Sequence, residues 1–382
     1  MKKLKSLLVT LAILLCAISA SAHDFEVDGI YYRITDSEKL TVAVTYQGSS
    51  YSEYSNEYTG SVVIPETVTY DSKTYSVTSI GCDAFRYCRS LTSVTIPNSV
   101  TSIGNRAFEG CNSLTSVTIG DGVTSIGNRA FECCSSLTSI TIGDGVTSIG
   151  EEAFNECSSL TSVHISDISA WCNIKFGCVE SNPFLFGVGS NPLYYAKHLY
   201  MNGKEITELV IPDGVTTIGN YAFSGCSSLT SVTIPNSVTS IGDFAFYGCD
   251  ALESVKVLAE TPPFANDNTF SNYEIELCVP EKSISVYQTT NPWSNFKSIR
   301  ALTDEETGIS NVQVLPVEVQ ANNGTIIVTG ADDGTMVEVF DISGTKLGEA
   351  KTTFNTATIN TEAQSGSVVI VKVGNKAIKI KI

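Results

Sequence analysis

The chain has 382 residues, a length that predicts two or three domains at about 150 residues each. Its net charge of −17, from 23 basic and 40 acidic residues, argues against a nucleic-acid-binding protein, which normally carries a basic surface. With 42% hydrophobic and 16% charged residues, the composition excludes an ordinary acidic disordered chain. Only three histidines are present, which leaves little material for histidine-based catalysis.

Residues 1–22 have the features of a secretory signal peptide. Three lysines at the start are followed by an apolar run over 7–18 and by Ala20-Ser21-Ala22, a small-x-small cleavage site. The apolar run is shorter than the roughly 20 residues of a transmembrane helix. We therefore expect a protein that is secreted or held at the cell surface, in association with the outer membrane, and whose mature chain has no transmembrane segment.

Residues 23–60 are predicted to form an N-terminal β cap. They carry the alternating runs Gly29–Ile34 and Leu40–Val44, which are typical of the two strands of a hairpin. A stack of repeats follows this segment. Without a cap, the first repeat would expose apolar surface and a sheet edge.

Residues 61–300 are built from a 23-residue repeat. Residues 99–121 and 122–144 agree at 19 of 23 positions, and the same frame runs from 76 to 259 as eight repeats. Six of these are clear, and the two within 168–213 are degenerate. A period of this length is typical of leucine-rich repeats and other solenoids.

Each repeat contains one strand and a returning segment. The pattern Leu-x-x-Val-x-Ile, as at Leu91, Val94 and Ile96, predicts a strand whose Val and Ile face the interior. A second apolar group, with Ile103 and Phe108, must point back into the same interior. Because one coil cannot bury its own apolar side, stacked coils share one core. The predicted fold is mainly β, a solenoid of 23-residue coils.

The string Ile-Gly-x-x-Ala-Phe-x-x-Cys-x-x-Leu-x-x-Val-x-Ile recurs nearly intact and resembles the BspA-like, or Treponema-type, leucine-rich repeats of bacterial surface proteins. The resemblance covers about residues 61–298. It implies a secreted or surface-displayed scaffold without catalytic activity or cofactor. Some members of this family are adhesins, so the implied partner is a protein or glycan at a host or bacterial surface, and not a nucleic acid. The alternatives are a structural spacer without a specific ligand and an enzyme.

The outward side chains of the repeat strands form the candidate binding surface, since solenoids present extended surfaces to partners. Alternation along the strands places mostly Ser and Thr at these positions. The predicted residues are Ser93, Thr95, Ser116, Thr118, Ser139, Thr141, Ser162, His164, Ser231, Thr233 and Lys256. The alternative is a solvated sheet face without a ligand, because threonine suits a strand in any case.

No motif for catalysis or for a metal site is recognised. Neither G-x-S-x-G nor H-E-x-x-H occurs, so no catalytic residue is proposed. The aspartates at 121, 144, 167 and 213 share one phase of the repeat and are compatible with stacked calcium ligands. Asp-Gly is also ordinary turn chemistry, and we therefore predict no metal site.

Six of the twelve cysteines recur at the same phase and are expected to stack in the interior: Cys88, Cys111, Cys134, Cys157, Cys226 and Cys249. We interpret them as buried thiols that fill space, because every clear coil has the same packing demand. Disulfides would need a defined geometry between coils. Cys172 and Cys178 lie in the degenerate repeats, where a local disulfide is the alternative.

After a polar linker, residues 301–310, the segment 311–382 predicts a small β-sandwich. Its strand-like runs are 325–329, 336–340, 367–373 and 377–382, and Gly374-Asn375 suits a two-residue hairpin. The run Val337–Gly344 and the lysine-containing end resemble C-terminal sorting domains of the type IX secretion system. That resemblance implies an export or attachment role. A plain β-sandwich module is the alternative.

Overall fold

The computed structural model describes residues 22–49, 57–177 and 190–303, and in the C-terminal part 318–322, 325–331, 334–341, 345–353, 356–361, 367–373 and 376–381. The chain divides into two compact units, Met1–Leu302 and Thr303–Ile382. The predicted signal peptide up to residue 21, Cys178 and the Gly374-Asn375 turn lie outside the described residues. Within the described ranges, no helix has the length and apolar character needed to cross a membrane.

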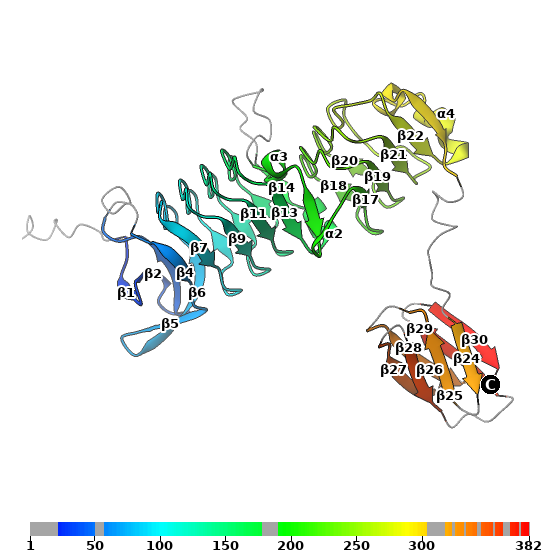
Figure 1. Ribbon diagram of the computed structural model, residues 1–382, viewed down its shortest axis with the longest axis horizontal. Coiled ribbons are helices and arrows are strands. Elements are labelled where there is room, and N and C mark those ends of the chain that lie inside the picture. The colour runs from blue at the N-terminus through cyan, green and yellow to red at the C-terminus, as the bar shows by residue number, and fades with distance from the viewer. Residues whose placement is uncertain are drawn as a thin grey trace, which may run out of the picture. The chain divides into compact units, whose positions relative to one another are not determined.

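One face of the solenoid, which we name the strand face, begins with a seven-stranded sheet (Figure 1). Neighbouring strands from β7 to β13 are 23 residues apart and pair in parallel register, which confirms the predicted solenoid of 23-residue coils. Along the sheet the strands are β4 (Gly60–Val63), β7 (Leu91–Thr95), β9 (Ser116–Ile119), β11 (Ser139–Ile142), β13 (Ser162–Ile165), β15 (Leu199–Met201) and β16 (Lys204–Glu205).

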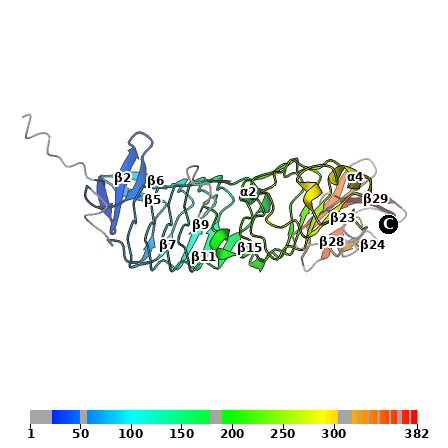
Figure 2. The ribbon, with the colours of Figure 1, turned by 90° about the horizontal axis from the view of Figure 1, so that it is seen from above.

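The opposite face starts at the N-terminal cap and forms a second layer (Figure 2). In the cap, β1 (Phe25–Val27), β2 (Ile30–Asp36) and β3 (Thr41–Thr45) pair antiparallel. The predicted hairpin is therefore extended by β1, whose three residues are too few to show alternation. β3 pairs in parallel with β6 (Lys73–Ile80), which also pairs with β5 (Thr67–Tyr70). Short strands continue this sheet: β8 (Ser102–Ile103), β10 (Ser125–Ile126), β12 (Ser148–Ile149) and β14 (Lys175–Phe176).

A separate parallel sheet forms the strand face of the second half. Its strands are β17 (Glu208–Val210), β19 (Ser231–Ile234), β21 (Ser254–Val257), β22 (Glu276–Val279) and β23 (Ser298–Ala301). On the opposite face, β18 (Thr217–Ile218) pairs with β20 (Ser240–Ile241). Three short helices close this end, η1 (Glu281–Ser283), α4 (Ile284–Tyr287) and η2 (Trp293–Asn295).

The two degenerate repeats are in fact one long coil and a hairpin, not two coils of normal length. β13 pairs with β15 so that Leu199 lies beside Val163, 36 residues earlier in the chain rather than 23. Two helices lie in the chain between β13 and β15, α2 (Ile168–Cys172) and α3 (Leu193–Ala196). β16 then runs antiparallel to β15 instead of starting a new coil. The strand face is therefore interrupted before β17.

Stacked phenylalanines occupy the centre of the solenoid core. Phe85, Phe108, Phe131 and Phe154 are fully buried. Neighbouring rings in this row lie 4.9 to 5.3 Å apart and are parallel to within 5°. The same stacking recurs in the second half. Each ring thus stacks on the ring of the next coil, so the regular stacking of the coils extends into the core.

The cysteines of the repeat pack beside these rings as thiols, in agreement with the interpretation from sequence. The thiols of Cys111, Cys134 and Cys157 each donate to the carbonyl oxygen of the phenylalanine 26 residues earlier, at 3.0 to 3.1 Å. Burial raises the pKa of the Cys157 thiol to about 12. Cys172 is likewise a buried free thiol. These residues therefore fill the core and satisfy backbone carbonyls.

The C-terminal unit consists of two antiparallel sheets around its own core. Ile326 and Val328 from one sheet and Val339 and Val371 from the other belong to a single buried cluster. The first sheet contains β24 (Glu318–Asn322), β25 (Thr325–Thr329) and β28 (Thr356–Asn360). The second contains β27 (Lys346–Lys351), β26 (Met336–Asp341), β29 (Val368–Val373) and β30 (Lys376–Lys381). The mainly β fold of this region is as predicted, with three further strands, β24, β27 and β28.

Glu57 in the N-terminal cap is expected to make the stability of the fold depend on pH. Burial raises its pKa from 4.5 to about 7, against the effect of the Gln47 backbone N–H, which donates to both carboxylate oxygens. Between these values the folded state holds a proton that the unfolded chain has released, so this contribution to stability is lost as the pH rises through about 7. We expect the melting temperature to fall between about pH 5 and about pH 8, and Glu57→Gln to reduce the fall. Thermal melts by circular dichroism test this, and an equal fall in the variant contradicts it.

Candidate binding surface

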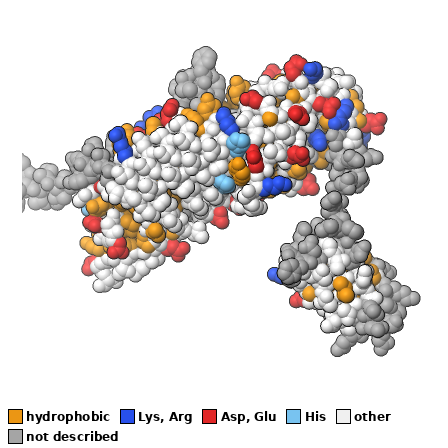
Figure 3. Space-filling model, in the orientation of Figure 1, with side chains coloured by type: hydrophobic (Ala, Val, Ile, Leu, Met, Phe, Trp, Pro, Cys, Tyr) orange, Lys and Arg blue, Asp and Glu red, His pale blue; other side chains and the backbone are white. Residues whose placement is uncertain are grey.

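The structure places eight of the eleven predicted residues in two straight rows along the first sheet of the strand face. Register pairs each residue with its neighbour one coil away. One row is Ser93, Ser116, Ser139 and Ser162, and the other is Thr95, Thr118, Thr141 and His164. All eight are at least partly exposed. Over these strands the molecule presents a broad uncharged surface (Figure 3).

Strand β4 adds one residue to each row. Ser61 pairs with Ser93, and their hydroxyl oxygens lie 2.8 Å apart. Val63 lies beside Thr95 and is 65% exposed, so the second row begins with an apolar side chain. Neither residue is predicted from the repeat pattern, because Gly60 pairs with Leu91 where the other strands have leucine.

The two rows end at a cluster of rings that sequence spacing did not predict. The His164 ring stacks on Tyr200 with centroids 5.0 Å apart. Nearby, His198 Nδ1 lies 2.6 Å from Glu205 Oε1, across the β15–β16 hairpin. In the sequence, Asn202-Gly203 between two extended runs predicts this hairpin as a two-residue turn, but it does not specify which coil the hairpin joins.

The other three predicted residues belong to the second sheet. Ser231 follows Glu208 in one row, and Thr233 and Lys256 follow Val210 in the other. Charged side chains are more frequent over this half than over the first (Figure 3). The predicted surface is therefore two surfaces of different character, and no strand of the described chain joins them.

A hollow of about 500 Å³ separates the two sheets. We name it the wedge. It is bounded by β16 on one side and by β17 on the other, and its lining residues are Ile168, Met201, Lys204, Glu205, Ile206, Thr207, Glu208, Leu209 and Val210. The wedge combines apolar side chains, carboxylates and the edge of a sheet, so it offers both apolar and charged contacts.

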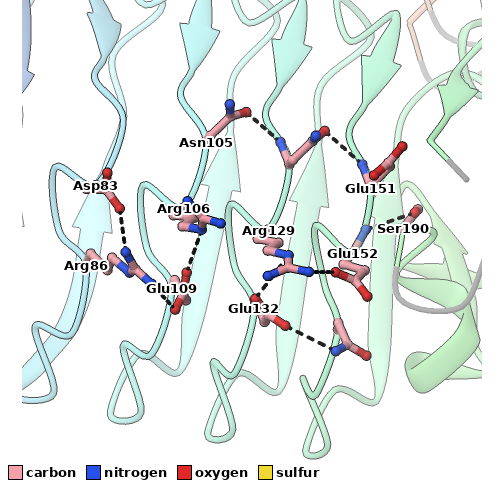
Figure 4. A network of polar contacts seen from close by, with 12 residues as sticks. Asp83, Arg86, Asn105, Arg106, Glu109, Arg129, Glu132, Glu151, Glu152 and Ser190 are labelled. Atoms are coloured by element: carbon pink, nitrogen blue, oxygen red, sulfur yellow. Dashed lines mark hydrogen bonds and ion pairs between the residues drawn. The ribbon is translucent and has the colours of Figure 1, made fainter. Parts of the chain in front are cut away.

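Away from the strand face, the turns after β6, β8, β10 and β12 carry a polar network that joins successive coils (Figure 4). The Arg86 guanidinium donates to Glu109 of the next coil at 2.7 Å, and Arg129 pairs with both Glu132 and Glu152. On the same turns, the side-chain oxygen of Asn105 accepts the backbone N–H of Asn128, and the side-chain oxygen of Asn128 accepts the backbone N–H of Glu151. Because these ion pairs and hydrogen bonds join successive coils, the network has a structural role in the stack.

Three of the four turn aspartates, Asp121, Asp144 and Asp167, have structural partners. The Asp121 carboxylate accepts the backbone N–H of Asp144, whose own carboxylate accepts the hydroxyl of Ser166. Asp167 caps helix α2 by accepting the N–H groups of Ser169 and Ala170. Within the described part of the chain, no group of three or more His, Cys, Asp or Glu side chains is placed to hold a metal ion.

The repeat can now be compared with known proteins. A family model described as BspA type leucine rich repeat region matches residues 74–178 and 195–303, in six copies. The chain belongs to the BspA-type leucine-rich repeat family. The matched ranges leave out residues 179–194, which fall between β13 and β15 in the sequence, where the 23-residue spacing of paired strands is lost. No curated protein matches the chain.

Several solved structures of bacterial leucine-rich repeat proteins are similar to this chain. The T. pallidum leucine-rich repeat protein is 24% identical over 60% of this chain and 90% of its own, with a TM-score of 0.39. One from Bacteroides capillosus is 28% identical over 37% of this chain and 98% of its own, with a TM-score of 0.30. One from Bacteroides ovatus is 22% identical over 73% of this chain and 90% of its own, with a TM-score of 0.27.

Proposed function

We propose that this BspA-type protein is a secreted or cell-surface scaffold that binds a protein or glycan at a host or bacterial surface through its strand face. The observation that carries the proposal is the pair of in-register rows from Ser93 to Ser162 and from Thr95 to His164. Hydroxyl groups that repeat at coil spacing offer many equivalent hydrogen bonds to an extended partner. A surface spacer without a ligand is the alternative.

A binding role agrees better than catalysis with the contacts of the described histidines. His23 lies against the ring of Tyr31, His164 stacks on Tyr200, and His198 is joined to a carboxylate. A hydrolytic site needs a base within hydrogen-bond reach of a nucleophile. The contacts of His164 and His198 are with a ring and a carboxylate, which supports a non-catalytic protein.

The test replaces two threonines in the middle of the second row. Thr118→Arg with Thr141→Arg puts two large cations on the uncharged surface, so we expect binding to weaken at least about tenfold, equal to about 1.4 kcal/mol. Titration of the full chain on immobilised matrix proteins, mucin glycans and bacterial cells measures this. Thr124→Arg with Thr147→Arg adds the same charge to the opposite face and serves as the control. Equal binding by both pairs contradicts the proposal, and no saturable binding by the unmodified chain favours the spacer.

We also propose that residues 311–382 direct export or surface attachment. What supports this is their resemblance to sorting domains and the separate core of the C-terminal unit. Deletion of 311–382 should move the protein from the cell-surface fraction to the periplasm, as followed by fractionation and immunoblotting. An unaltered distribution would leave the unit as a plain β-sandwich module.

A further inference from the structure

The wedge is a break in an otherwise continuous strand face. β16 ends the first sheet and β17 begins the second, and neither strand has a partner on the side that faces the wedge among the described residues. Edge strands with unpaired backbone groups are templates for the addition of another strand. The wedge has the position of a missing strand between two sheets.

The backbone of β17 determines which groups face the wedge. In a parallel pair, alternate residues direct both backbone groups toward the same neighbour. The Ile211 N–H donates to Thr233, and the carbonyl of Thr207 accepts from Thr230, so the odd-numbered residues face β19. Glu208 and Val210 therefore direct their N–H and C=O groups toward the wedge.

The side chains around this edge favour a particular occupant. Ile168 and Leu209 are buried at the base of the hollow, and Val210 is 63% exposed at its margin. The lining contains two carboxylates, Glu205, which also lies 2.6 Å from His198, and Glu208, and one cation, Lys204. An added strand would place alternate side chains over the apolar and the acidic positions, because successive residues of a strand point to opposite faces.

We propose that the wedge binds an extended peptide segment of a partner protein, which adds to the edge of β17 and carries cationic side chains next to Glu205 and Glu208. The recognised class is thus a strand with alternating apolar and basic residues, held by main-chain hydrogen bonds. This inference rests on the proposed role of the strand face as a recognition surface. It adds a specific pocket between the two Ser and Thr surfaces.

The test uses the full chain and a labelled synthetic peptide of sequence Lys-Val-Lys-Val-Lys, followed by fluorescence anisotropy. We expect saturable binding that is absent for the same peptide N-methylated at every backbone nitrogen, because it has no N–H to donate, and weaker for Glu-Val-Glu-Val-Glu. Val210→Pro removes the N–H that faces the wedge but leaves the β19 ladder intact, and should weaken binding about five- to tenfold. Glu208→Gln should weaken binding in a salt-dependent manner.

Val63→Pro is the matched control. Val63 is equally exposed and lies on the other open edge, where Ile64 donates to β7 and Val63 faces outward. The inference is overturned if the lysine peptide does not bind, if Val210→Pro binds as the unmodified chain does, or if Val63→Pro costs as much. If Val210→Pro does not fold, the N-methylated peptide decides. If the peptide does not bind but a partner still binds through Thr118 and Thr141, only this inference is rejected. If neither the peptide nor a partner binds, the proposed function is rejected as well.

Discussion

Replacement of Phe131 by alanine is expected to lower the free energy of unfolding of the solenoid by about 3–5 kcal/mol. The ring is fully buried between Phe108 at 5.0 Å and Phe154 at 5.3 Å, so its removal leaves a cavity lined on both sides by aromatic rings. Each coil contacts only its neighbours, and the two adjoining interfaces are therefore weakened together. Guanidinium denaturation followed by circular dichroism measures the change.

Phe264→Ala is the matched control, because Phe264 is 66% exposed. The same chemical change on the surface should alter the free energy of unfolding by no more than about 0.5 kcal/mol. A loss at Phe131 no larger than the loss at Phe264 would show that the stacked rings do not hold the coils together.

Gly145→Ala is expected to cost about 2–3 kcal/mol, although it adds only one methyl group. A Cβ at this position would lie 1.9 Å from the carbonyl oxygen of Asp121 in the preceding coil. That oxygen belongs to the backbone, so relief requires the two coils to move apart. Because the strands on either side stay paired only at the present spacing, the cost spreads into the ladder. The denaturation midpoint and the slope of the transition measure the effect.

Ser99→Ala provides the comparison for this glycine. Ser99 holds the same position in the repeat, 46 residues earlier, and already carries a Cβ. Its hydroxyl is buried without a hydrogen-bond partner, so removal should change stability by less than about 0.5 kcal/mol. If alanine at position 145 costs no more stability than alanine at position 99, close contact between the turns does not explain why residue 145 is glycine.

The strands that the sequence analysis missed share a cause. β27, Lys346–Lys351, has no apolar alternation because it lies at the edge of its sheet, and four of its residues are charged or glycine on a largely exposed segment. β14 contains two residues, which is too short for any period, whereas Asn202-Gly203 does predict the hairpin that contains β16. Such elements form because a neighbouring strand offers backbone hydrogen-bond partners. Their position is therefore set by the neighbouring strand and not by a pattern in their own residues.

The candidate surface was predictable where it repeats. The rows through Thr118 and Thr141 follow from alternation and a constant coil length, since equal phase means equal position in a stack. The contact of Tyr200 with His164 does not follow, because it spans the long coil, whose length no repeat specifies.

By itself, the sequence determined the length of the coil, the residues that face the interior and the outward Ser and Thr rows, because each of these is a local property copied every 23 residues. Only the tertiary structure decided where the stack is interrupted. The β15–β16 hairpin pairs with β13 in place of a regular coil, and this leaves the edge of β17 open to the wedge. The physical reason is that strand pairing depends on which strand edges meet in space. Because β16 turns back and pairs with β15, it occupies the sheet edge with which the next coil of a regular repeat would have paired.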